Sequence, residues 1–380
     1  MKSQCPSTDR LSTLPQSIIE NILTLMPIRD ALKTSILSKK WRYCWTGMPK
    51  LEFCYDFTLH YGPLEKYKFL SAIFHVLLLH KGPLLEFRLI VGVADMEMVF
   101  DQIIPYLSRS NNVKNFILVS QDIYRLPTSF FSWQGLELLS LESCNLEPPL
   151  KFNGFSKLKR VWFIDVEISA YTLECIFSSC PLLEELTLVD YEEDLVGDNN
   201  FTCAKLVTCV PLIKFLHLSS KYIKYLSAGG MPQKLPTSLV YLKTLYLDVC
   251  FMKQDEISCA LCLLRSSPNL EKINFQMYDN EKFPVQQNSI NSLDPEDYSD
   301  LKLDHLLQLE IYMFSNLFLE MEFVKLIMAK SPVLKKALIK FNDNVSADEE
   351  MGILRDLILL PFPRASPSAK LTVERSEKTR

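Results

Sequence analysis

"CPLLEELTLVDY" occupies residues 180–191, and its centre alternates apolar and polar side chains: Leu186, Thr187, Leu188. Alternation with a period of two is typical of a β-strand, in which every second side chain points to the same face. Leu186 and Leu188 are therefore expected to face inward, and Thr187 outward. The same L-x-x-L-x-L shape, with Ile, Val or Phe replacing some leucines, recurs at residues 84–91, 113–120, 135–146, 157–168, 210–220, 240–250 and 267–277.

The spacing of these phrases predicts a repeat protein. Their middle apolar positions, aligned along the chain, are Phe116, Leu139, Val161, Leu186, Leu216, Leu245 and Ile273. The steps between them are 23, 22, 25, 30, 29 and 28 residues, which falls in or near the range of leucine-rich repeats. One such repeat cannot bury its apolar face alone, whereas stacked repeats form a continuous core.

We therefore expect an α/β fold: a leucine-rich-repeat solenoid over residues 82–330, with parallel strands on its concave side and helices and turns on its convex side. Residues 169–181 and 255–268 are candidate convex helices. Prolines that would end a helix just before the next strand phrase are Pro181, Pro211 and Pro268. Residues 55–81 predict a connecting helical segment, and the polar stretch 279–304 predicts a long loop.

The outward positions of the expected strands form the candidate surface for a target protein. These candidate target-binding residues are Ser140, Trp162, Thr187, His217, Tyr246 and Asn274. A register error of one residue would exchange the two faces of a strand. Repeat surfaces also follow no general recognition code, so the identity of the target stays open.

The composition is that of a folded, soluble protein and argues against several other classes. The chain has 380 residues, 48% hydrophobic and 23% charged, with a net charge of −4. That charge gives no general attraction to nucleic acid or to an anionic membrane, and the longest apolar run, residues 69–79, is too short to span a bilayer. Eleven irregularly spaced cysteines and no recognisable secretory signal favour a cytoplasmic or nuclear location, or both.

No pattern of an enzyme active site is present. Only 10 glycines occur, and neither a GxGxxG nor a GxxxxGK[ST] loop is found. The single CxxC, Cys259 to Cys262, lacks a second Cys/His pair nearby in sequence, so buried thiols on a helix face are favoured over a zinc or redox site. We therefore expect no catalytic residue, no metal and no cofactor.

Residues 8–46 have the pattern of three short helices. Pro15 suits a first helical turn, and Asp30 and Ser38 are candidate caps for the second and third helices. Trp41 and Trp45 would share one face of the third helix. The segment 29–42 has a local charge of +4, which leaves three interpretations: a nucleic-acid patch, an apolar seam between helices, or a surface for a protein partner. The helical spacing favours the seam over the nucleic-acid patch.

Two ends of the chain resemble known segments. "DRLSTLPQSIIENILTLMPIRDALKTSILSKKWRYCW", residues 9–45, resembles an F-box of the plant type in its Leu-Pro start, its double apolar helix and its closing "LSKKWRYCW". "SPVLKKALIKF" (331–341) through "LLPFPRASPSAKLTVE" (359–374) is similar to the FBD segment that follows leucine-rich repeats in a large plant F-box family, most specifically at Arg364–Ala369. The resemblance implies an F-box at 8–54 and an FBD-like α+β cap at 331–374.

The resemblance also implies a function. F-box domains dock on a Skp-type adaptor, which links them to a cullin–RING ubiquitin ligase, while the rest of the chain captures a target protein. The adaptor-binding residues implied by position are Leu14, Pro15, Ile18, Ile22, Leu25, Leu32, Ser35, Leu37, Lys40 and Trp41. Among them Trp41 would be a large, rigid anchor of the kind that interface hot spots favour, and the basic neighbours would steer an acidic partner.

The chain departs from the F-box family pattern at two places, and one alternative function remains open. The family often has a basic-Arg pair where this chain has Lys39-Lys40, and an apolar or aromatic residue where it has Cys44. Lysine does not replace arginine in planar pairing, so a modest loss of adaptor affinity is expected. The alternative function is a leucine-rich-repeat interaction scaffold that has no role in a ligase.

Overall fold

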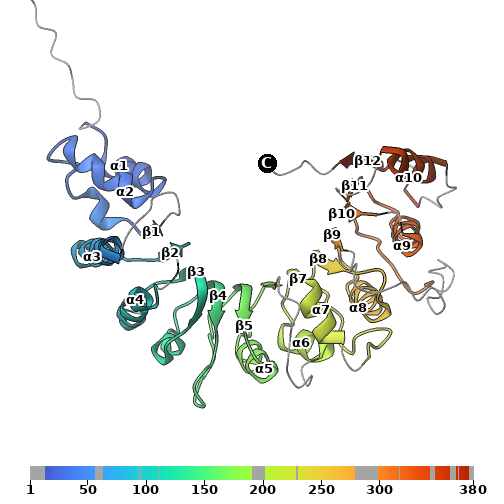
Figure 1. The fold of residues 1–380 in the computed structure, drawn as a ribbon, viewed down its shortest axis with the longest axis horizontal. Coiled ribbons are helices and arrows are strands. Elements are labelled where there is room, and N and C mark those ends of the chain that lie inside the picture. The colour runs from blue at the N-terminus through green and yellow to red at the C-terminus, as the bar shows by residue number, and fades with distance from the viewer. Residues whose placement is uncertain are drawn as a thin grey trace, which may run out of the picture. The chain divides into compact units, whose positions relative to one another are not determined.

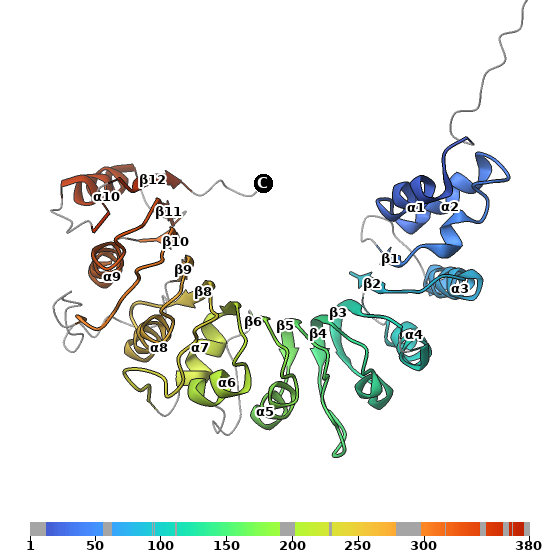
Figure 2. The same ribbon diagram turned by 180° about the vertical axis from the view of Figure 1, so that it is seen from behind.

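The computed structural model describes residues 13–375 with gaps. The gaps are residues 56–62, 93, 95, 111, 191–201, 228–229, 279–297, 316, 343–346, 360–364 and 367. The described chain forms two compact units: residues 1–158 with 166–168, and residues 159–165 with 169–380. Each unit is a parallel β-sheet with helices on one face (Figures 1 and 2).

The first unit begins with short helices and continues into a sheet. Its helical elements are α1 (Gln16–Thr24), α2 (Ile28–Lys33), η1 (Thr34–Ile36), η2 (Cys44–Gly47), α3 (Pro63–Leu79), α4 (Glu97–Ser110) and η3 (Thr128–Ser132). Its strands are β1 (Lys50–Tyr55), β2 (Glu86–Val91), β3 (Asn115–Arg125) and β4 (Leu138–Asn145). The strands are parallel neighbours in chain order.

The second unit repeats a strand–helix pattern. Its first strand is β5 (Arg160–Glu167), which belongs to this unit up to residue 165. The other strands are β6 (Glu185–Val189), β7 (Phe215–Leu218), β8 (Thr244–Val249), β9 (Lys272–Met277), β10 (Gln308–Phe314), β11 (Lys336–Phe341) and β12 (Lys370–Arg375). Its helices are α5 (Ala170–Ser178), α6 (Cys203–Cys209), α7 (Ser220–Ser227), α8 (Gln254–Arg265), α9 (Phe318–Ala329) and α10 (Ala347–Leu359). All strand pairs described in this unit are parallel and follow chain order.

The register predicted from the repeat spacing is confirmed. Phe116 is paired with Leu139 in the first unit, and Val161, Leu186, Leu216, Leu245 and Ile273 form one ladder in the second. All seven side chains are buried. Inward side chains from successive strands therefore stack into one core in each unit, with the helices closing one side. We call the opposite side of each sheet, which the helices leave uncovered, the open face.

The helices between the strands also agree with the sequence. The α5 and α8 helices lie within or next to the predicted segments, and α5 begins after Ser169, whose hydroxyl accepts a hydrogen bond from the N–H of Thr172 (3.1 Å). The predicted connecting helix is α3. Residues 298–304 form the end of the predicted loop, whose residues 279–297 lie outside the described chain.

Strand pairing extends beyond the boundaries predicted from the sequence. The β1 strand begins inside the predicted F-box segment, yet it is paired with β2 of the repeats. At the other end β11 is paired with β10, and β12 with β11, so the FBD-like segment continues the sheet of the second unit. Its phrase at residues 364–369 is described in part: the hydroxyl of Ser366 donates to the carbonyl of Leu334 (2.8 Å). No helix among the described residues has the length and apolarity needed to cross a membrane.

Two helix starts were predicted wrongly. The α2 helix begins at Ile28, directly after Pro27, so Asp30 is a first-turn residue that pairs with Lys33 (2.7 Å) and is not a cap. The predicted third helix is absent from the described chain: residues 39–43 form turns, and the 3₁₀ helix η2 follows. Ser38 therefore caps nothing, because no α-helix starts directly after it.

Candidate protein-binding surfaces

The first candidate surface is an exposed apolar face on the N-terminal helices. In α1 the buried side chains are Ile19 and Leu23, which point into the protein. Ile18 (43% exposed) and Leu25 (87% exposed) lie on the helix surface away from that core. Pro15, the residue before the helix, is exposed as well. Apolar side chains gathered on a surface in this way are typical of a protein interface.

The N-terminal helices also expose two residues that the sequence prediction missed. Leu37 was predicted and is 49% exposed, but its neighbour Ile36 (87%) and Tyr43 (64%) are exposed to a greater extent. Ile36 closes η1, and Tyr43 precedes η2. The closely spaced turns between these short helices could have predicted that Ile36 and Tyr43 are exposed. A chain that turns every few residues cannot bury every apolar side chain.

The remaining predicted adaptor-binding residues are at least partly accessible. Leu14, Ile22, Leu32 and Ser35 are half-buried, and Lys40 is exposed. The Ser35 hydroxyl donates to the carbonyl of Arg42 (3.0 Å), and the Lys40 ammonium donates to the carbonyl of Leu14. Lys40 thus ties the last turn of this segment to its first residues. The basic side chains of the segment, at positions 29, 33, 39, 40 and 42, reach the surface.

Trp41 requires a correction. Its side chain is only 2% exposed, and that of Trp45 is 4% exposed. Both indoles therefore belong to the interior of the first unit, where η2 packs against α1 and α2. A side chain with so little accessible surface has almost none left to bury against an adaptor. Of the interpretations considered for the two tryptophans, the apolar seam between helices is confirmed, and the exposed anchor is wrong.

The N-terminal helices are joined to the first repeats by backbone hydrogen bonds. The N–H of Lys81 donates to the carbonyl of Thr46 (2.8 Å), and the N–H of Leu85 donates to that of Pro49 (2.8 Å). His80 Nε2 lies 2.7 Å from the Met48 carbonyl oxygen. Together with the β1–β2 ladder, these bonds fix the helices to the sheet.

Gly82 allows a close backbone approach to Gly47 at this junction. A Cβ atom at residue 82 would lie 2.8 Å from the carbonyl oxygen of Gly47 and 3.0 Å from its Cα atom. We expect Gly82→Ala to lower the free energy of unfolding of the first unit by about 1–3 kcal/mol, because backbone atoms must move to accommodate the methyl group. Urea unfolding followed by tryptophan fluorescence measures this change.

The matched control is Gly352→Ala in α10, where a Cβ would meet nothing within 4 Å. This substitution should stabilise the protein slightly, by about 0.5–1 kcal/mol, because alanine is the better helix former. Equal effects of the two substitutions would contradict the assignment of Gly82 as a steric contact point.

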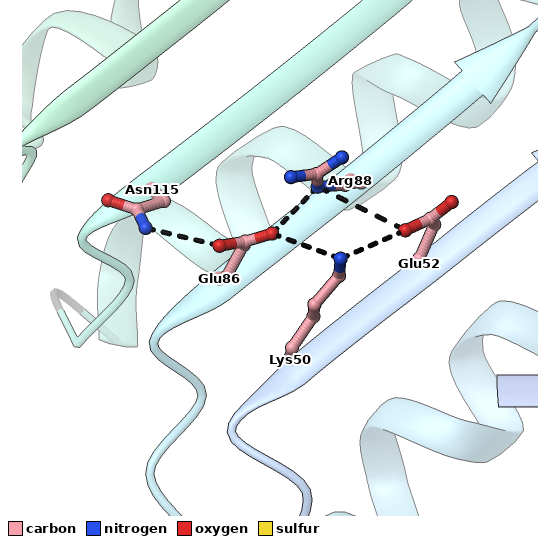
Figure 3. A network of polar contacts seen from close by, with 5 residues as sticks. All are labelled: Lys50, Glu52, Glu86, Arg88 and Asn115. Atoms are coloured by element: carbon pink, nitrogen blue, oxygen red, sulfur yellow. Dashed lines mark hydrogen bonds and ion pairs between the residues drawn. The ribbon is translucent and has the colours of Figure 1, made fainter. Parts of the chain in front are cut away.

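Charged side chains reinforce the same junction on the open face (Figure 3). Lys50 Nζ lies 3.2 Å from Glu52 and 3.5 Å from Glu86, and Arg88 Nε lies 2.7 Å from Glu86. Asn115 donates to the other oxygen of Glu86 (3.1 Å). Burial raises the pKa of Glu86, but the hydrogen bonds from Asn115 and Arg88 outweigh burial and hold it below its ordinary value. Two cations and two anions compensate each other here, so this network links β1 to β2 with balanced charge.

The second candidate surface is the open face of the second unit. The ladder that pairs Trp162 with Thr187, Thr187 with His217, His217 with Tyr246, and Tyr246 with Asn274 contains five of the six predicted target-binding residues. Ser140 occupies the corresponding place on β4 of the first unit, paired with Ile117. On each sheet these residues alternate with the buried positions, as the register predicts. Whether they contact a target remains a prediction.

Asn274 is the one buried residue among the six predicted target-binding residues. Its side chain is 8% exposed and donates to Glu310 of the next strand (3.2 Å). Glu310 also accepts from Lys272 (2.9 Å). The amide of Asn274 is engaged in orienting this carboxylate, so the expectation that it is an accessible contact residue needs correction.

A hollow of about 560 Å³ lies on the open face of the second unit. Its lining residues are Trp162, Ile164, Glu185, Thr187, Lys214, Phe215, Lys243 and Thr244. Phe215, one position before the inward Leu216, was missed by the sequence prediction. The ladder itself holds the signal, because the residue before each inward leucine also faces outward.

The two cysteines of the CxxC sequence, Cys259 and Cys262 of α8, are buried, as predicted. A hydrogen bond with Cys203 and burial raise the pKa of Cys259 well above its ordinary value, which favours the protonated thiol over the nucleophilic thiolate. Within the described ranges no three His, Cys, Asp or Glu residues are grouped to hold a metal ion.

Comparison with known proteins relates the chain to one family. The F-box domain family matches residues 11–53, and the leucine-rich repeats of the FBD-associated F-box protein At5g56370 match residues 105–210. F-box/FBD/LRR-repeat protein At1g13570 of Arabidopsis thaliana is 31% identical over 96% of this chain and 98% of its own length. F-box/FBD/LRR-repeat protein At5g56420 of the same plant is 33% identical over 55% of this chain and 49% of its own length.

Fold and surfaces thus define a leucine-rich-repeat protein with an N-terminal F-box. The chain belongs to the F-box/FBD/LRR-repeat family of plants. F-box proteins with such repeats are in general adaptors or receptors of SCF-type ubiquitin ligases rather than enzymes, and an F-box in general interacts with a Skp-type adaptor.

Proposed function

We propose that this chain is the substrate receptor of a Skp–cullin–F-box ubiquitin ligase. Its F-box docks on a Skp-type adaptor, and its repeats capture a target protein for ubiquitination. The chain supplies no catalytic group of its own. The observation that carries this proposal is the set of exposed apolar side chains within the F-box match, formed by Ile18, Leu25, Ile36, Leu37 and Tyr43.

The energetics of these side chains support docking. Large apolar side chains that are 43–87% exposed, as these are, release ordered water when a partner covers them, at about 25 cal/mol per Å² of apolar area. A few such residues at the centre of an interface dominate its affinity. The exposed lysines and arginines around them favour association with an acidic partner.

The junction supports the second half of the proposal. A receptor must present its target at a fixed position relative to the adaptor. A flexible joint would lower the effective concentration of the target at that position. Here the F-box is fixed to the first repeats by the β1–β2 ladder, by the backbone bonds at Thr46 and Pro49 and by the charge network of Figure 3. The F-box and the first repeats are therefore held as one body, so a docked adaptor would keep a fixed position relative to these repeats.

The decisive experiment is binding of the full chain to a purified Skp-type adaptor, with wild type beside Leu14→Ala/Pro15→Ala. Pro15 is exposed at the start of α1 and Leu14 is half-buried, so the double variant removes contact surface at one end of the apolar face. We expect adaptor affinity to fall at least about tenfold, since interface anchors contribute above about 1 kcal/mol each. Biolayer interferometry measures the affinity, and circular dichroism checks that the variant is folded.

Leu150→Ala is the matched control, because Leu150 is fully exposed in a turn after β4, outside the F-box match. It should bind the adaptor like wild type. Wild-type affinity of the Leu14→Ala/Pro15→Ala variant would refute the docking assignment. A folded wild-type chain that binds no adaptor would favour the alternative function, a repeat scaffold without a ligase role.

A further inference from the structure

Three of the last four strands of the second unit carry a lysine at the same position on the open face. The position before each inward residue is occupied by Lys272 on β9, Gln308 on β10, Lys336 on β11 and Lys370 on β12, and these four are paired in register. We call Lys272, Lys336 and Lys370 the cationic row. Adjacent strands lie about 4.8 Å apart, so the row extends over roughly 14 Å across the strands.

Two of these lysines have no acidic partner among the described residues. Lys272 is paired with Glu310 (2.9 Å). Lys336 and Lys370 are exposed, and neither forms an ion pair within the part of the chain that the structure describes. They stand directly opposite each other on adjacent strands, and like charges in this arrangement destabilise a sheet.

The acids nearby are already engaged. Glu374 of β12 pairs with Lys340 of β11 (3.7 Å), and Glu350 of α10 is bound by Arg375. Lys335, just before β11, adds a further exposed cation. The local field on this part of the open face is therefore positive, although the whole chain has a net charge of −4.

Protection of a sheet edge does not account for the row. Lysines on an edge strand prevent pairing with a second sheet, and Lys370 on β12 fits that role. Lys336 lies on β11, which has a neighbour on each side. A lysine at this inner position has no edge to protect. Its charge instead contributes to the positive potential of the open face.

We propose that the cationic row binds an acidic, Asp/Glu-containing segment of the target protein, laid across the strands. This inference rests on the proposed function and names the chemistry of its target. The hollow on the same face supplies a second contact, since Trp162 and Phe215 can accept an apolar side chain. From β7 to β11 there are four strand spacings, about 19 Å, which an extended chain covers in about six residues. The target segment thus has an apolar residue about six positions from its acidic group.

The test uses the full chain and a fluorescein-labelled peptide of about 12 residues, long enough for an extended chain to reach from the hollow to the row. The peptide carries one leucine and, about six positions on, a run of glutamates. Fluorescence anisotropy measures binding at low salt. The same peptide with glutamines in place of the glutamates should bind at least about tenfold more weakly, and added salt should weaken only the glutamate peptide. A peptide with serine in place of leucine should bind more weakly, because serine cannot fill the hollow.

The variants Lys336→Glu/Lys370→Glu and Lys336→Gln/Lys370→Gln should both lose binding, the first at least about tenfold. Because the glutamine pair removes a like-charge contact, it should fold at least as well as wild type. The charge-matched control is Lys151→Glu/Lys157→Glu, which changes exposed turn lysines outside the strands and should leave binding within about twofold.

Equal affinity for the glutamate and glutamine peptides, or unchanged binding by both row variants, would overturn the proposal. Binding of a phosphoserine peptide alone, with the glutamate peptide silent, would also overturn it. The Leu14→Ala/Pro15→Ala variant should bind the peptide like wild type. If the wild-type chain binds peptide but no adaptor, the ligase role falls and the cationic row stands. If it binds adaptor but no peptide, the ligase role stands and the cationic row falls.

Discussion

Replacing Glu256 with alanine is expected to lower the free energy of unfolding of the second unit by about 3–5 kcal/mol. Glu256 lies in the first turn of α8 and is 1% exposed. Its carboxylate accepts hydrogen bonds from the backbone N–H of Cys250 (2.9 Å) and from the hydroxyl of Tyr278 (2.7 Å). Lys253 Nζ lies 3.2 Å away. Alanine would leave the buried N–H of Cys250 and the half-buried hydroxyl of Tyr278 without this acceptor, and an unsatisfied buried donor costs about 1–3 kcal/mol.

Thermal and urea unfolding followed by circular dichroism measure this loss. The control is Asp255→Ala, which removes an exposed acid from the same helical turn and should change stability by less than about 0.5 kcal/mol. Glu256→Gln should lie between the two, because the amide keeps one oxygen for the N–H of Cys250. If Glu256→Ala unfolded like Asp255→Ala, the buried carboxylate would have no part in holding α8 to β8 and β9.

Glu320 is a second buried carboxylate of this kind. It lies in the first turn of α9, is 3% exposed, and accepts from the N–H groups of Ser315 (2.9 Å) and Leu317 (3.1 Å). Each carboxylate accepts hydrogen bonds from backbone N–H groups in the connection between a strand and the helix that follows it. Sequence alone gives no reason to separate Glu256 from its exposed neighbour Asp255, since only the turn decides which side chain points inward.

The repeat register was predictable because it depends on short-range alternation. A strand buried on one face must place apolar residues two apart, and a stacked array must repeat that pattern on each strand. The spacing therefore aligned Val161 through Ile273 correctly. Strand β1 was not predicted from the sequence, because the F-box resemblance already covered those residues. The joining of β11 and β12 to the sheet was not predicted either, because the FBD resemblance suggested a separate cap. Motif boundaries describe sequence similarity, whereas hydrogen bonding continues across them.

The F-box surface was predictable in outline and less so in detail. The expected contact residues Ile18 and Leu25 do lie on the exposed side of the first helix. Helical spacing could not place Trp41, because an apolar residue at that spacing serves a partner or the protein's own core equally well. The segment around Trp41 is made of turns and a 3₁₀ helix, to which a period of 3.6 does not apply.

Trp41→Ala and Leu25→Ala are expected to separate core from interface. Trp41 is 2% exposed, so its truncation should cost the first unit about 3–5 kcal/mol of unfolding free energy. Leu25 is 87% exposed, so its truncation should change stability by less than about 0.5 kcal/mol. Leu25→Ala should nevertheless weaken adaptor binding about tenfold in a fully folded chain. Urea unfolding and biolayer interferometry on the same samples give both numbers.

Both variants reduce adaptor binding if the F-box docks, but for different reasons. Binding by Trp41→Ala should recover under conditions that restore the folded fraction, since only the unfolded chain fails to bind, whereas the defect of Leu25→Ala should persist under every condition in which the chain is folded. A Trp41→Ala variant of unchanged stability that still lost the adaptor would return Trp41 to the interface. Unchanged affinity of Leu25→Ala would instead move the docking face toward Ile36 and Tyr43.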